Sequence, residues 1–143
     1  MRFFFYSPVA FEPWNWQNSI ERGIGGSETS HVEMVWRLAK RGHDITSYVP
    51  LPKDSLREWR GTRWLPVEEA TFVEDGIWVL YRCPEVIDRF MFPWRPARLW
   101  LVLQDWNYAT LWSHQRLDRL ERLVPLSHAH KHWRSEEHTS ELQ

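Results

Sequence analysis

The stretch Gly23–Thr29 reads GIGGSET, and it decides how the rest of this chain is interpreted. Three of its first four residues are glycine, which can adopt positive φ and lets a backbone approach a ligand closely. Ser27 suits the N-cap of a helix, and an amphipathic run continues from there to Arg41. The first turn of such a helix presents N–H groups without intrahelical partners and the positive end of the helix dipole. The stretch therefore predicts a binding site for a phosphate or another anion.

The segments on both sides of this stretch predict the strands of a parallel sheet. Arg2–Tyr6 is a short apolar run closed by Ser-Pro, and Ile45–Val49 is a second expected strand, ended by Pro50. We expect a long loop over Val9–Arg22 and then a helix over Glu28–Lys40 between them. The order strand, loop, helix, strand is the opening of a parallel α/β sheet.

The remaining pattern continues this alternation. Strands are expected at Thr62–Val67, Gly76–Tyr81, Leu99–Leu103 and Leu123–Leu126; helices at Pro84–Phe90, Leu111–Leu123 and from Ser127 onward; and a polar linker or short helix at Leu51–Arg60. The sequence therefore predicts a Rossmann-like parallel sheet flanked by helices.

The end of the chain differs from the rest. The last ten residues, 134–143, resemble the in-frame translation of a sequencing adapter, and a scar of this kind carries no information about the fold. We expect one natural domain over residues 1–133, truncated there, and an artefactual tail over 134–143. The alternative is a genuine polar tail.

Composition narrows the function classes. The formal net charge is −1, and because the tail holds one basic and three acidic residues, the rest carries +1. Neither value suggests a nucleic-acid-binding protein or a membrane-surface protein. The single cysteine, Cys83, excludes an internal disulfide, and the apolar start is too short for a signal or a membrane span. These features favour a cytoplasmic protein with no membrane span.

Polar residues follow several of the expected strands. Gln104 and Asp105 come directly after Leu99–Leu103, and Arg82 follows another strand. Ligands of open α/β sheets bind outside the carboxyl ends of the strands, so Gln104 and Asp105 are site candidates. Arg82 could pair with a phosphate or with Glu85, and we favour the ion pair.

The segment Trp14-Asn15-Trp16 has two interpretations. In a loop, its aromatic faces could stack on sugar rings while the Asn15 amide binds hydroxyl groups. The alternative is that both tryptophans are buried and anchor the loop.

Three stretches together resemble the N-terminal domain of GT-B-fold glycosyltransferases, in particular the large retaining class called family 4. They are Gly25–Glu28 with the helix that continues to Ile45, the strand Leu99–Leu103 closed by Gln104-Asp105, and Val124–Trp133 with its Ser127-x-x-His130 turn. The order and spacing of these stretches agree with that class and span nearly all of residues 1–133.

The resemblance implies transfer of a sugar from a nucleotide-sugar donor to a glycan or another hydroxyl acceptor. The N-terminal domain would hold the acceptor, and a second domain, absent here, would hold most of the donor. No cofactor is implied beyond the nucleotide-sugar substrate, and no metal is expected because the chain has no Asp-x-Asp motif. This half alone is expected to be inactive.

The implied site residues fall into three groups. The donor diphosphate would meet Gly25, Gly26 and Ser27; the acceptor would meet Glu28, Trp14, Asn15, Trp16, Gln104 and His130; and Asp105 is the catalytic candidate. Gln104 departs from the family pattern, in which histidine is common, and an amide cannot exchange protons. Glu28 could instead only favour the helix start, and Asp105 could instead cap a turn.

The alternating histidines His128, His130 and His132 do not predict a metal site, because on a helix they share no face.

Two other classes of function remain open. An NAD-dependent oxidoreductase is disfavoured because Glu28 stands where the third glycine of G-x-G-x-x-G would fall, and no acid ends the second strand. A non-enzymatic carbohydrate- or partner-binding module would use a tryptophan-rich surface, for which the chain offers 11 tryptophans.

Overall fold

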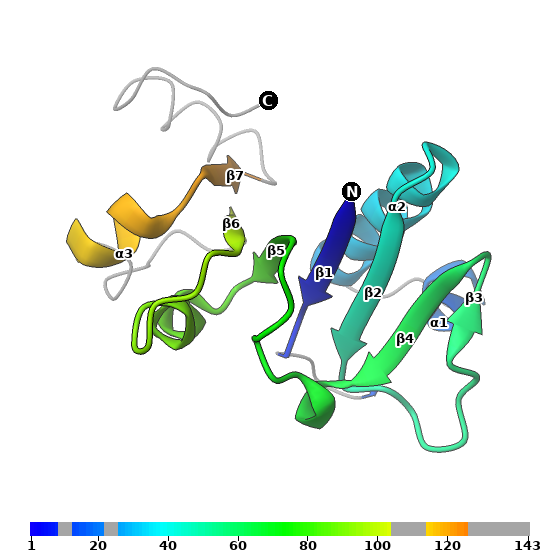
Figure 1. The fold of residues 1–143 in the computed structure, drawn as a ribbon. Helices are drawn as coiled ribbons and strands as arrows, with labels where there is room; N and C mark the ends of the chain where they lie inside the picture. Colours follow the sequence, from blue (N-terminus) through cyan, green and yellow to red (C-terminus); the bar gives the residue numbers. More distant parts are fainter. Residues whose placement is uncertain (9–12, 22–25, 104–113, 126–143) are drawn as a thin grey trace.

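The computed structural model describes residues 1–8, 13–21, 26–103 and 114–125 (Figure 1). Its seven strands form one sheet in the order β3-β4-β2-β1-β5-β6-β7. The strands are β1 (Arg2–Tyr6), β2 (Asp44–Val49), β3 (Glu58–Trp59), β4 (Thr62–Pro66), β5 (Ile77–Tyr81), β6 (Arg98–Leu103) and β7 (Arg122–Pro125). The helices are α1 (Trp16–Glu21), α2 (Gly26–Lys40), α3 (His114–Arg119) and the 3-10 helices η1 (Val67–Glu69) and η2 (Pro84–Phe90).

The sheet is parallel except at one edge, where β3 pairs antiparallel with β4. From β1, the next parallel strands β2 and β4 follow one another toward one edge of the sheet. The chain then crosses back, and β5 pairs with the other side of β1. Numbered without β3, the parallel strands lie in the order 3-2-1-4-5-6, which is a strand order of doubly wound sheets. The expected α/β class is confirmed, and the strand order reverses between β1 and β5.

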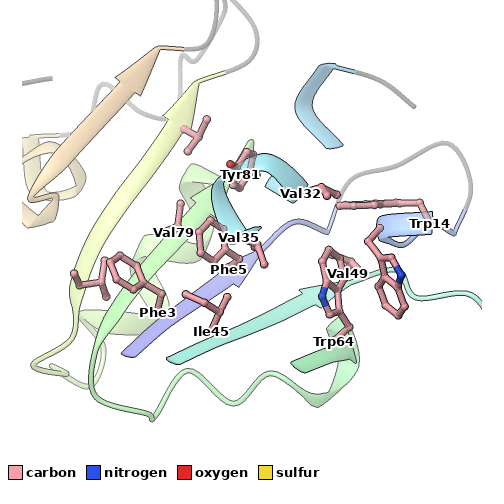
Figure 2. Close-up of a cluster of buried hydrophobic side chains, with 13 residues drawn as sticks. Phe3, Phe5, Trp14, Val32, Val35, Ile45, Val49, Trp64, Val79 and Tyr81 are labelled. Atoms are coloured by element: carbon pink, nitrogen blue, oxygen red, sulfur yellow. The ribbon is translucent and has the colours of Figure 1, made fainter. Parts of the chain in front are cut away.

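Both faces of this sheet are buried, as expected of parallel strands with helices on each side. On one face, Phe3, Phe5 and Val79 point toward Val32 and Val35 of α2 (Figure 2). We call this the α2 face; its buried members are Phe3, Phe5, Trp14, Trp16, Val32, Val35, Ile45, Val49, Trp64, Ile77, Val79, Tyr81 and Val102. The opposite face, the η2 face, buries Phe4, Tyr48, Phe72, Trp78, Leu80, Cys83, Ile87, Phe90, Ala97, Leu99, Leu101 and Leu123.

The expectation of an unbroken loop over Val9–Arg22 is wrong in its second half, because α1 begins at Trp16. The cause is local: Asn15 Oδ1 accepts hydrogen bonds from the backbone N–H groups of Gln17 (2.9 Å) and Asn18 (3.3 Å). That is the N-cap arrangement, which satisfies donors that a helix start leaves unpaired. A helix of six residues is too short to show a recognisable periodic pattern of apolar residues in the sequence.

The segment Leu51–Arg60 also differs from the expected linker or short helix, because its end forms strand β3. Arg60 (φ 51°) and Gly61 (φ 80°) connect β3 to β4 with positive φ at both positions. Two such residues make the tight hairpin turn that matches the twist of antiparallel strands. Arginine rarely adopts this conformation, so the residue types at positions 60 and 61 did not predict a hairpin turn.

Two expected helices differ in kind or length. The helix over Pro84–Phe90 is present as the 3-10 helix η2, whereas the one expected over Leu111–Leu123 is described only as α3. The expected helix ends too late, because strand β7 already begins at Arg122. The first three residues of the expected helix, 111–113, lie outside the described part.

Gly76 fixes the approach of the two central strands. It precedes β5 with φ 154°, and a Cβ built there would lie 2.7 Å from the backbone oxygen of Arg2. Only glycine allows the chain to pass this close to β1.

Candidate functional site at the carboxyl edge of the sheet

The candidate site is the edge of the sheet where β1 and β5 end and the strand order reverses. The helix α2 carries the chain from the carboxyl end of β1 back to β2, so its first turns lie at this edge. Tyr81, the last residue of β5, brings its hydroxyl to 3.5 Å from Ser30 Oγ and donates to Met34 Sδ at 3.4 Å. The start of α2 and the end of β5 are therefore in direct contact at the reversal point.

The amino-terminal end of α2 carries the residues predicted to bind a diphosphate. The helix begins at Gly26 and runs for 15 residues, so Ser27 is one residue inside it rather than at the N-cap. Its first N–H groups have no partner within the helix. Glu28 lies in the first turn and is 9% exposed. Gly25 lies outside the described residues.

A buried polar pair that the sequence analysis did not select lies beneath this edge. His31 of α2 is 0% exposed, and its Nε2 lies 2.9 Å from Ser47 Oγ of β2. The imidazole stacks between the rings of Tyr81 (centroids 5.1 Å apart) and Trp64 (5.4 Å). Burial lowers the pKa of His31 to about 3, so the ring is neutral at physiological pH. A histidine inside the apolar stripe of a helix was the available signal.

The segment Trp14-Asn15-Trp16 is engaged by the protein itself. Trp14 is 1% exposed and lies edge-on to Trp64, with ring centroids 5.9 Å apart (Figure 2). Trp16 is 8% exposed and stacks on Trp59. Besides capping α1, Asn15 donates from Nδ2 to Ser55 Oγ at 2.9 Å. This is the anchoring interpretation, and it leaves little of either indole for a sugar; acceptor contact by these residues stays a prediction.

The end of β5 is conformationally unusual. Arg82 has φ 59°, in the left-handed region, and its backbone N–H donates to Val102 O at 3.4 Å. Non-glycine residues in this region cost free energy and cluster at functional sites. The next residue, Cys83, is 2% exposed, and burial raises the pKa of its thiol well above the usual value. The thiol is therefore protonated and unsuited to act as a nucleophile.

Gln104, Asp105 and His130 lie outside the described residues, as does the turn after β7. Among the residues that are described, no group of three or more His, Cys, Asp or Glu side chains is arranged to hold a metal ion. No helix in that same part of the chain is both long and apolar enough to cross a membrane.

Comparisons with protein-family models, with curated proteins and with solved structures found no match. What the site can do therefore follows from its geometry. The start of α2, an acid in its first turn and an arginine with positive φ all lie at the reversal point of a parallel sheet.

Proposed function

We propose that this chain is the acceptor-side domain of a GT-B-type glycosyltransferase, which transfers a sugar from a nucleotide-sugar donor to a hydroxyl acceptor. The observation that carries the proposal is the position of the Gly26-Ser27-Glu28 helix start beside the reversal point between β1 and β5. Ligands of open α/β sheets bind at that point. The three stretches that resemble family 4 enzymes supply the choice of reaction.

The chemistry of the helix start fits this role. The leaving group in such a transfer is a nucleoside diphosphate, whose negative charge grows in the transition state. Backbone N–H groups at Gly26 and Ser27, together with the helix dipole, would stabilise that charge without needing to reorganise. Glu28 carries a negative charge itself, so its proposed partner is an acceptor hydroxyl rather than the diphosphate.

A titration of the purified chain with UDP tests the diphosphate site. We expect measurable UDP binding that is lost in Gly26→Val, because a branched side chain at the helix start blocks close approach. Ala39→Val is the matched control, since it places the same residue near the other end of α2. Glu28→Gln should bind UDP as well as or better than the parent chain, because a nearby negative charge has been removed.

Other ligands distinguish the competing functions. Binding of NADH but not UDP would favour a dinucleotide-binding oxidoreductase, which uses the same strand order. Glycan binding that is unchanged in Gly26→Val would favour a non-enzymatic carbohydrate-binding module. A folded chain that binds none of UDP, NADH or glycan would contradict the proposed function.

A further inference from the structure

A second candidate site lies at the other end of α2, away from the carboxyl edge. A surface hollow of about 480 Å³ is lined there by Trp36, Arg37, Lys40 and Arg41. We call it the Trp36 hollow. Its wall is one half-buried indole, and its other three lining side chains are cationic.

A fourth cation reaches the same indole from a distant part of the chain. Lys40 Nζ lies 4.1 Å from the centroid of the Trp36 ring, and Arg60 Cζ lies 5.2 Å from it. Arg60 belongs to the β3–β4 hairpin turn, where its backbone has a positive φ of 51°. Two separate elements therefore deliver positive charge to one aromatic ring.

Within the described part of the chain, one of these four cations is paired with a carboxylate. Arg37 pairs with Glu33 at 3.3 Å, in an exposed contact. Over the described residues, Lys40, Arg41 and Arg60 form no salt bridge with a carboxylate. Cations gathered around one ring lie within about a Debye length of one another, roughly 10 Å at 0.1 M salt, and therefore repel.

The helix dipole accounts for only part of the cluster. Cations in the last turn of a helix are stabilised by its negative end, which explains Arg37 and Lys40, and Arg41 follows them directly. Arg60 is not on the helix. The rings of Trp36 (5.2 Å) and Trp59 (5.1 Å) attract its guanidinium, but it adds positive charge near Lys40 that the dipole does not offset. A bound anion would offset it, because each cation would gain a charge-assisted hydrogen bond.

We propose that the Trp36 hollow binds a phosphate ester, with the phosphate among Lys40, Arg41 and Arg60 and the attached organic group against the indole. The hollow is at the opposite end of α2 from the diphosphate site and does not depend on it. The phosphate could belong to a soluble metabolite or to a lipid headgroup, since both present the same group to these cations.

The experiment is an NMR titration of the 143-residue chain with glycerol 3-phosphate at low salt, which follows the Trp36 indole N–H signal. That signal is assigned as the one missing in Trp36→Phe. We expect it to shift with saturation, and the affinity to fall about tenfold in Lys40→Gln and in Arg60→Gln, the loss typical of a hydrogen bond to a charged group. Lys53→Gln is the matched control, because Lys53 is exposed and carries the same charge but is neither among the residues that line the hollow nor among the cations over the Trp36 ring.

A second arm replaces the ligand with vesicles of phosphatidic acid in phosphatidylcholine. Vesicle binding that depends on Lys40 and Arg60 assigns the phosphate to a lipid headgroup, and glycerol 3-phosphate binding alone assigns it to a soluble ester. Equal losses in Lys40→Gln and Lys53→Gln would overturn the proposal, since binding would then follow net charge. An unmoved Trp36 signal with either ligand, in a chain whose circular dichroism is native, would overturn it as well.

Discussion

Both faces of the sheet bury large aromatic side chains, but one face also buries an imidazole and the other a thiol. On the α2 face, the neutral base His31 lies among stacked rings and bonds to Ser47. On the η2 face, Trp78 stacks between Phe4 and Tyr48, and the buried group is the neutral thiol of Cys83. Burial lowers one pKa and raises the other, because each charged form is disfavoured away from water. Acid should therefore weaken the first face through His31. Alkali should weaken the second face through Cys83 and, at higher pH, the first face through Tyr81, whose buried hydroxyl also has a raised pKa.

The largest expected effect comes from removing the ring that the α2 face is built around. Trp64 is 0% exposed and contacts His31, Trp14 and Trp16. Trp64→Ala is expected to lower the free energy of unfolding by about 4 kcal/mol, the usual range for a buried Trp or Phe. It should also raise the pKa of His31, because the cavity opens the imidazole to water. Urea unfolding and histidine NMR titration measure the two effects.

Phe90→Ala on the η2 face is the matched control. Phe90 is also 0% exposed, so its loss should cost a similar free energy. The pKa of His31 should not move, because Phe90 packs on the opposite side of the sheet. A parallel shift in both variants would mean that the two faces do not act separately.

The next effect concerns the central strands that both faces share. Gly76→Ala places a Cβ 2.7 Å from Arg2 O and 3.1 Å from Phe4 Cε2. We expect a loss of about 3 kcal/mol, since a backbone contact of this kind cannot relax cheaply. Gly42→Ala separates strain from the clash: its φ is +90° but nothing lies within 4 Å, so about 1 kcal/mol should be lost. Thermal melts of both variants measure these losses. Equal losses in the two variants would contradict a special role for the close approach of Gly76 to the Arg2 backbone.

A smaller effect is the acid sensitivity of the α2 face. The pKa of His31 is about 3 in the fold and ordinarily 6.5, so between these values the unfolded chain binds the extra proton. Stability should therefore be full above pH 6.5 and fall as the pH drops, by about 2 kcal/mol at pH 5. Unfolding curves at pH 5 and 7 measure this change. In the double variant His31→Phe with Ser47→Ala, the part of the pH dependence that His31 contributes should disappear. A pH dependence identical to that of the parent chain would show that His31 does not cause it.

The smallest effect is the alkaline sensitivity of the η2 face. The pKa of Cys83 is raised in the fold, so above its unfolded value of about 8.5 the unfolded chain releases a proton that the folded chain keeps. Stability should fall by about 1 kcal/mol between pH 8.5 and pH 9.5. Cys83→Ala removes this part of the dependence. Rapid reaction of the native thiol with a disulfide reagent at pH 8 would show that Cys83 is not buried.

The sequence predicted the strands that turn residues border. The strands β1, β2, β4, β5, β6 and β7 lie within one or two residues of their expected bounds, because β1, β5 and β6 are apolar runs and because glycine and proline border the more mixed β2 and β4. The helix α1 and the strand β3 were missed because a single cap and a two-residue turn create them, and neither leaves a periodic pattern.

The candidate site was less predictable. The glycine-rich stretch predicted the start of α2, but nothing in the spacing of residues showed that His31 would meet Ser47. That pair depends on how the helix packs on β2. Likewise, the sequence around Trp14 and Trp16 is the same whether these side chains bind a sugar or pack in the core. Only their burial in the structure distinguishes the two interpretations.

The two-residue strand β3 has a consequence for how this protein meets other copies of itself. It lies at the margin of the sheet beside β4, and one of its two residues, Glu58, is charged and exposed. A margin this short offers an incoming strand few backbone groups to pair with, and charge at such a place discourages docking. On this side, the hairpin that brings Arg60 to Trp36 also guards the sheet against edge-to-edge aggregation.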